Sequence, residues 1–302
     1  MKQKARAHIA LLVTTLIFGV HYGIAKALMP GMLQPMQLLF LRSLGALILF
    51  WIFQKLFIRE KVERKDLIMI AVCGLFGFAL NQALFYLGLN LTTPVDASII
   101  HVLNPVFVLV FASILIKEKV TWIKVTGISL GAGGALILIL YGKSMGAGTN
   151  SFTGNILVML NMLFYAFYIV LMKPIVAKYH TATILKWVSL FGFLFIIPFS
   201  VKDMLVLDFA RITFQGWMGI LYIIVLNTFV AYLLINFALK FVEASSVSFY
   251  TYLQPVIASA MAVSLRGDTI TFPKVLAAVL IFTGVYLVNR NSKAGEGHET
   301  IS

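Results

Sequence analysis

The chain has 302 residues, of which 61% are hydrophobic and only 12% are charged. A soluble globular protein carries about 25% charged residues, so this composition excludes that class and indicates an integral membrane protein. The formal net charge of +13 does not indicate nucleic-acid binding, because the Lys and Arg residues lie between apolar stretches, where membrane topology places them.

Apolar stretches of about 20 residues, each long enough to cross a bilayer as a helix, recur along the chain. Ten membrane helices are predicted, over residues 8–28, 35–57, 67–89, 95–116, 122–141, 153–173, 182–201, 213–237, 244–265 and 272–289. A Gly-rich link over residues 142–150 separates two groups of five. We therefore expect two five-helix domains, residues 1–145 and 151–290, followed by a disordered cytoplasmic tail over residues 291–302.

The first span also has the features of a signal peptide, since basic residues precede an apolar run and small residues follow it. The second half argues against its removal. At an offset of 147 residues, Leu16 aligns with Leu163 and Lys26 with Lys173. A repeat that begins at the first span predicts that this span is retained.

The two halves repeat most clearly over residues 89–134 and 239–284, which align without a gap. An amide–proline pair, an acidic residue and a glycine recur at the same spacing: Asn104-Pro105 with Gln254-Pro255, Glu118 with Asp268, and Gly134 with Gly284. Chance does not readily produce all three, so the pattern indicates an internal duplication.

The distribution of Lys and Arg predicts the orientation. With the N-terminus in the cytoplasm, 17 of the 24 basic residues lie on the inner side and 6 on the outer, and Arg42 lies within a span. Basic residues favour the cytoplasmic side, so both termini are expected there. Because five is odd, the second half enters the membrane from the opposite side, which predicts inverted repeats. Secondary transporters with this architecture bind substrate near the midplane, between the halves.

Ten spans in two such repeats resemble the drug/metabolite transporter superfamily, and the EamA-type bacterial exporters most closely. The motifs that carry the resemblance are Asn104-Pro105, Gln254-Pro255, Lys117-Glu118-Lys119, residues 39–45 around an arginine, and residues 18–22. The resemblance implies export or exchange of amino acids, related metabolites or drugs across the bacterial inner membrane. The inverted repeat predicts alternating access as the mechanism.

Polar groups at midplane depth are costly in lipid and usually face the bundle interior or a water-filled cavity. The candidate substrate-binding residues are His21, Phe18, Asn81, His101, Asn104, Asn161, Tyr165, Tyr168, Asn227, Thr251 and Gln254. Their amides, imidazoles and aromatic rings suit a neutral or zwitterionic molecule with an apolar part. Polar side chains also hold membrane helices together, so helix packing is the alternative role for each asparagine.

Three further residues interrupt the apolar spans. Pro105 and Pro255 each remove a backbone donor and leave a carbonyl unpaired one turn earlier, which predicts either a gating kink or a static bend. Arg42 is expected to be structural, and to reach outward to the interface or to pair with a helix end.

Other functional classes find less support. All eleven acidic residues lie at span ends or in loops, and no metal-binding, nucleophile or phosphate-binding motif is present. We therefore expect no enzyme activity and no cofactor. The expected partners are a small-molecule substrate and the lipid bilayer, without nucleic acid, and a monomer is the working expectation. A passive channel remains the alternative, because a pore can use the same polar lining. Without a carboxylate in mid-span, uniport or exchange is expected, or proton coupling through His21 or His101.

Overall fold

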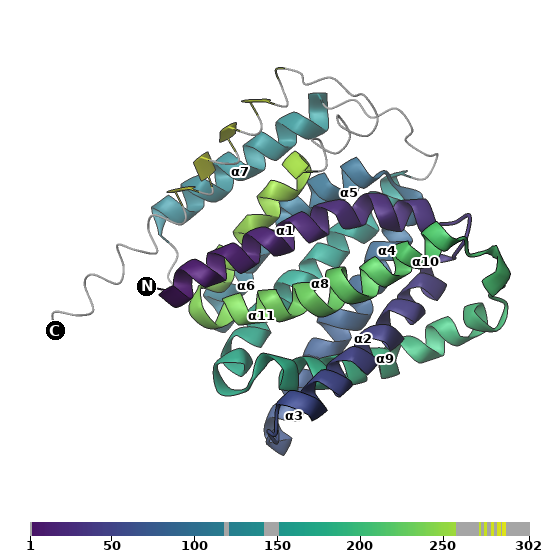
Figure 1. The fold of residues 1–302 in the computed structure, drawn as a ribbon. Coiled ribbons are helices and arrows are strands. Elements are labelled where there is room, and N and C mark those ends of the chain that lie inside the picture. The colour runs from purple at the N-terminus through teal and green to yellow at the C-terminus, as the bar shows by residue number, and fades with distance from the viewer. Residues whose placement is uncertain are drawn as a thin grey trace.

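A computed structural model describes residues 2–117, 121–141 and 151–257, together with nine residues between 272 and 287. In this part of the chain every regular element is helical (Figure 1). Seven helical segments there are long and apolar enough to cross a membrane. The predicted all-helical membrane fold is thereby confirmed. The link at residues 142–150, the tail after residue 290 and half of the predicted tenth span lie outside the described residues.

The first half begins with two unbroken helices, α1 (Lys2–Leu28) and α2 (Pro35–Phe57). The next span is divided into α3 (Arg64–Cys73), the π-helix η1 (Gly74–Leu80) and α4 (Asn81–Leu91). The fourth consists of α5 (Pro94–Ile100), the 3₁₀ segment η2 (His101–Leu103) and α6 (Asn104–Leu115), and α7 (Trp122–Tyr141) follows.

The second half follows the same order. It contains α8 (Ser151–Lys178), α9 (Thr181–Leu205), the short 3₁₀ turn η3 (Phe209–Arg211), α10 (Phe214–Tyr222), the π-helix η4 (Ile223–Val230) and α11 (Ala231–Phe241). After these come α12 (Ala244–Phe249) and the 3₁₀ segment η5 (Tyr250–Leu253). The predictions for the third and eighth spans missed the π-helices. In the fourth and ninth spans the prolines predicted a kink or bend, but not that the backbone before each proline is a 3₁₀ segment.

The 3₁₀ segments have a direct cause in the sequence. Pro105 has no N–H to give to the carbonyl of His101, four residues earlier. The N–H of Asn104 bonds to that carbonyl instead, which is the tighter i to i+3 pattern of a 3₁₀ turn. In the second half, the N–H of Gln254, the residue before Pro255, bonds in the same way to the carbonyl of Thr251. The unpaired carbonyls that the sequence predicted are therefore satisfied within the backbone.

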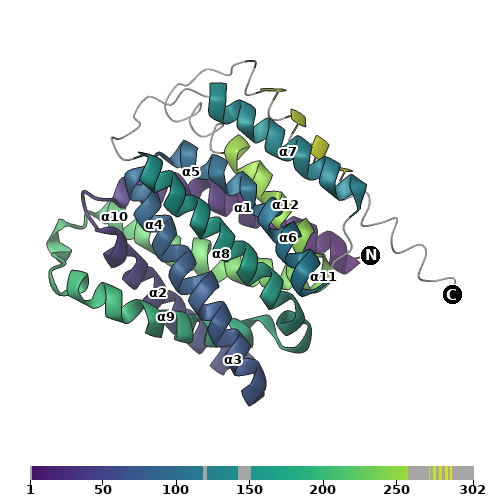
Figure 2. The same ribbon diagram turned by 180° about the vertical axis from the view of Figure 1, so that it is seen from behind.

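Helices from the two sequence halves pack against each other along most of their length (Figures 1 and 2). The most extensive contacts join α2 to α9, α4 to α8, and α1 to α11. Between α4 and α8, Gly88 faces Gly154: a Cβ atom on Gly88 would lie 2.8 Å from the carbonyl oxygen of Gly154. Only glycine allows two backbones to approach this closely. The interface between the halves is thus as tightly packed as a single core.

Two lysines related by the repeat close the ends of two helices. Lys26 Nζ donates to the carbonyl oxygens of Leu89 and Thr92, both at 2.8 Å, at the end of α4. Lys173 Nζ donates in the same way to the carbonyl oxygen of Leu239, at 2.6 Å, near the end of α11. The last carbonyls of a helix lack intrahelical partners and form the negative end of its dipole, so an ammonium group stabilises them.

Candidate substrate-binding site

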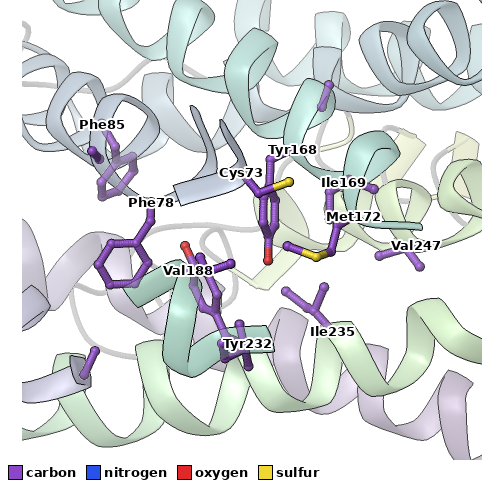
Figure 3. Packing of buried hydrophobic residues seen from close by; sticks show 14 of the residues in the cluster. Cys73, Phe78, Phe85, Tyr168, Ile169, Met172, Val188, Tyr232, Ile235 and Val247 are labelled. Carbon is purple, nitrogen blue, oxygen red and sulfur yellow. The ribbon is translucent and has the colours of Figure 1, made fainter. Parts of the chain in front are cut away.

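A cavity lies between the two halves of the bundle. Its walls come from α1, α2, α4 and η2 of the first half and from α8, η4, α11, α12 and η5 of the second. It contains about 720 Å³ of space between atoms, counting its open end. Figure 3 shows part of the apolar packing at this level, where Tyr232 and Ile235 of α11 lie near Tyr168 of α8. The irregular backbone of η2, η4 and η5 therefore lies next to the cavity. Backbone that departs from the α-helix is tolerated within a membrane only where it is buried in protein or lines a cavity.

Nine of the eleven candidate substrate-binding residues line this cavity. They are Phe18, His21, Asn81, His101, Asn161, Tyr165, Asn227, Thr251 and Gln254. These nine residues come from both halves of the repeat and face the same cavity. Whether each of these residues touches substrate stays a prediction.

The other two candidates, Asn104 and Tyr168, are buried beside the cavity and contact neighbouring side chains. Asn104 Nδ2 donates to Thr251 Oγ1 at 3.4 Å. The hydroxyl of Tyr168 accepts from Asn236 Nδ2 at 3.2 Å. Pro105 and Pro255 are also absent from the cavity lining as described. They act on the site through the 3₁₀ turns that precede them.

One wall of the cavity is a hydrogen-bonded group that joins α1 to both 3₁₀ segments. The hydroxyl of Tyr22 donates to Gln254 Oε1 at 2.7 Å and is also hydrogen-bonded to His101 Nδ1. A hydroxyl has a single proton to donate, so the bond with His101 places the proton on the imidazole Nδ1. The ring of Phe85 packs against His101 and Tyr22, with centroids 5.7 Å from each. Tyr22 therefore connects the two halves at the level of the cavity.

A second polar wall surrounds Arg42, which is only 1% exposed. Arg42 Nε donates to Thr228 Oγ1 at 2.6 Å, and Nη1 donates to Gln82 Oε1. Both acceptors are neutral side chains on other helices. The expectation that Arg42 reaches the membrane interface or pairs with a helix end is wrong, because its guanidinium group lies in the cavity wall.

The asparagines of α4 and α8 bind each other's backbone. Asn81 Nδ2 donates to the carbonyl oxygen of Asn161 at 2.9 Å, and Asn161 Nδ2 donates to that of Asn81 at 2.7 Å. Gln82 Nε2 donates to Asn81 Oδ1 at 2.5 Å. Both asparagines thus contribute to helix packing at the same time as they line the cavity.

Reasoning from the sequence missed several lining residues, chiefly Tyr22, Arg42, Gln82 and Tyr232. A signal for three of them was present. Arg42 is the one charged residue deep inside a predicted span, and an intramembrane charge marks a functional site by default. Tyr22 follows Phe18 by four residues, so the two share a helix face. Gln82 is polar and lies within a predicted span next to Asn81, so the criterion that selected Asn81 also applied to it. Tyr232 carries no comparable signal.

The described lining has side chains that can bind a small molecule. In the part of the chain that the structure describes, no group of three His, Cys, Asp or Glu side chains is placed to hold a metal ion. The described lining offers amide, hydroxyl and imidazole groups, aromatic rings and one guanidinium group. Such a set can hold a small organic molecule by hydrogen bonds, ring contacts and charge.

Comparison with known proteins agrees with a transport site. The sequence model of the EamA-like transporter family matches residues 5–140 and 152–290. An uncharacterized transporter of Archaeoglobus fulgidus is 27% identical over 94% of this chain and 97% of its own length. A probable terminal-alkyne amino-acid exporter of Streptantibioticus cattleyicolor is 23% identical over 77% of this chain and 76% of its own. One solved crystal structure shares the fold, with a TM-score of 0.74 at 15% identity, over 98% of this chain and 99% of that one.

Proposed function

The chain belongs to the EamA-like transporter family, and on this premise we propose that it is a secondary transporter that exports small organic metabolites by alternating access. Membership confirms the resemblance to the drug/metabolite transporter superfamily, and the named relatives are transporters. The proposed substrates are amino acids or related compounds. The proposed location is the bacterial inner membrane, with both termini in the cytoplasm.

The cavity between the halves is the observation that carries this proposal. Each sequence half supplies one part of its wall, so a rocking motion of one half against the other would change which side the cavity faces. A pore needs no such division of its wall between two interchangeable units. This favours a carrier over a passive channel.

The proposed architecture has ten spans in two inverted five-helix halves, residues 1–145 and 151–290. Three kinds of observation support it: the internal repeat, the excess of Lys and Arg on the proposed inner side, and irregularities that recur at matching positions. The π-helices η1 and η4 and the 3₁₀ segments η2 and η5 occur at equivalent points of the two halves.

The proposed energy source is the gradient of the substrate itself, through uniport or exchange. The described cavity lining contains no carboxylate that could carry a proton across the membrane. His21 and His101 are the groups through which proton coupling would run if it exists.

The test is counterflow in proteoliposomes that contain the purified protein. Vesicles loaded with one amino acid should take up a trace of the labelled compound faster than empty vesicles, and uptake should saturate. A pore would give uptake that rises linearly with concentration and ignores the internal load. Accumulation driven by an imposed pH gradient would contradict uniport and exchange, and its loss in a His21→Gln, His101→Gln double variant would assign the coupling to these histidines.

A further inference from the structure

Arg42 is a buried cation whose described partners are all uncharged. Its guanidinium group donates hydrogen bonds to Thr228 Oγ1 and Gln82 Oε1. Its guanidinium carbon lies 5.8 Å from the ring centres of Phe78 and Tyr232. Aromatic faces attract a cation, but they do not neutralise its charge.

No described residue of the cavity lining is Asp or Glu, and Arg42 forms no ion pair with any described acidic residue. The acidic side chains that form described ion pairs belong to other sites, where Glu63, Asp66, Asp208 and Glu243 pair with Lys65, Lys178, Arg211 and Lys124, respectively. A charge held away from water is costly unless an opposite charge or strong hydrogen bonds compensate it. The positive charge of Arg42 therefore has no described counter-ion, and its guanidinium group lies in the wall of the cavity.

The guanidinium group of arginine presents a planar fork of N–H donors that matches the two oxygens of a carboxylate. Next to it, Asn227 precedes the Thr228 that accepts from Arg42. Asn227 lines the cavity, is 2% exposed, and its Oδ1 has no hydrogen-bond partner among the described residues. Arg42, which has no described counter-ion, and Asn227, whose Oδ1 has no described donor, line the same cavity. This pair suits a molecule that carries an N–H donor close to an anionic group.

We propose that Arg42 binds the carboxylate of the transported molecule, so that the carrier selects small organic acids and amino acids over the corresponding amides and amines. This inference rests on the proposed function, because it takes the cavity to be the substrate site. Arg42 then acts as a substrate-binding residue, and the side chains of Thr228 and Gln82 hold its fork in place.

Gln82 provides a way to test the charge without removing Arg42. Gln82→Glu places a carboxylate where an amide oxygen already accepts from the guanidinium group, so the cation is neutralised from inside the protein. The substitution also removes the donor from Gln82 to Asn81 Oδ1. Arg42→Gln and Arg42→Lys complete the set, and Arg211→Gln is the matched control, because the Arg211 side chain is 76% exposed outside the cavity.

The experiment compares paired compounds, each a short carboxylic acid or amino acid with its primary amide, in counterflow and in thermal-shift assays on purified protein. We expect the acids, but not the amides, to be transported and to raise the melting temperature. Hydrogen bonds to charged groups predict that Arg42→Gln and Gln82→Glu weaken apparent affinity for the acids roughly ten- to a hundredfold. Arg42→Lys should retain part of the affinity for the acids, and Arg211→Gln should bind them as tightly as the wild type.

The outcomes separate the two proposals. If no compound gives saturable counterflow, the transporter function fails together with the inference. If transport is saturable but amides are carried as well as acids, or acid affinity survives in a folded Gln82→Glu variant, only the role of Arg42 is overturned. Should Arg42→Gln fail to fold, Gln82→Glu still decides the question, because it retains the arginine.

Discussion

Asn81 and Asn161 exchange hydrogen bonds between α4 and α8, each amide donating to the backbone carbonyl oxygen of the other residue, at 2.9 and 2.7 Å. The exchange fixes the two helices relative to each other at the wall of the cavity. Helix packing, which the sequence offered as the alternative role of these residues, therefore has a definite geometry. Asn81 Oδ1 accepts from Gln82, so a substrate would meet Asn161 Oδ1, which has no described partner, rather than the two donors.

This exchange predicts a stability effect. Asn81→Leu and Asn161→Leu should each lower the free energy of unfolding by about 0.6–2 kcal/mol, the range for interhelical hydrogen bonds in membranes. Denaturation of the detergent-solubilised protein measures it. Ser113→Leu is the control, because that serine is partly exposed and donates within its own helix, to the carbonyl oxygen of Val110. Unchanged stability in both asparagine variants would show that the exchange is not a stabilising contact.

Gln254 and Asn104, equivalent in the repeat, should respond differently to the same substitution. Gln254 lines the cavity and accepts from Tyr22, whereas Asn104 lies behind it and donates to Thr251. We expect Gln254→Leu to reduce counterflow by at least about tenfold, which corresponds to roughly 1.4 kcal/mol. Asn104→Leu should mainly lower the melting temperature. Equal loss of counterflow in both variants, at equal stability, would contradict this distinction.

The prolines allow a test of gating. Pro255→Ala restores an N–H that can bond to the carbonyl of Thr251, so the 3₁₀ turn can relax toward an α-helix. If the turn has to move during transport, the variant should melt at a higher temperature and turn over severalfold more slowly. Pro105→Ala should likewise raise the melting temperature and slow turnover. Wild-type turnover in both variants would identify the turns as static bends.

Glycine substitutions should separate close contacts from open space. Gly154→Ala places a Cβ atom 2.9 Å from the carbonyl oxygen of Gly88, so α4 and α8 must move apart. We expect Gly154→Ala to lower the free energy of unfolding by about 1–3 kcal/mol, as at other overpacked sites. Gly23→Ala is the matched control, because a Cβ atom there has no neighbour within 4 Å. Equal melting temperatures for the two variants would show that α4 and α8 can move apart without a loss of stability.

Cysteine labelling tests the proposed orientation. Glu63 and Asp208 have side chains that are 62% and 56% exposed, and lie on opposite sides of the membrane in the proposed topology. In whole cells, Asp208→Cys should react with an impermeant thiol reagent, and Glu63→Cys should react only after lysis. The native Cys73 is fully buried, so background labelling should be low. The reverse pattern would overturn the orientation.

The sequence predicted the structure best where apolar runs have clear ends and where polar residues lie within them. The ends of α2 and α7 match the predicted spans 35–57 and 122–141, because a proline and a tryptophan begin these apolar runs. Nine of the eleven polar and aromatic candidates line the cavity, together with residues that the sequence did not single out. The π-helices could not be predicted, because apolar residues follow one another through η1 without a change in pattern. Arg42 was misplaced because a helix that is apolar on all sides does not reveal which face turns inward.

The lysines that bind the ends of α4 and α11 bear on chemical footprinting of this protein. Acylating reagents modify an amine only when its lone pair is free, and the ammonium groups of Lys26 and Lys173 donate to backbone carbonyls. Both should stay unmodified under conditions in which Lys61, an exposed lysine, reacts readily. Their acylation would then record the opening of a helix end, so two native residues can serve as reporters of large motions without any introduced label.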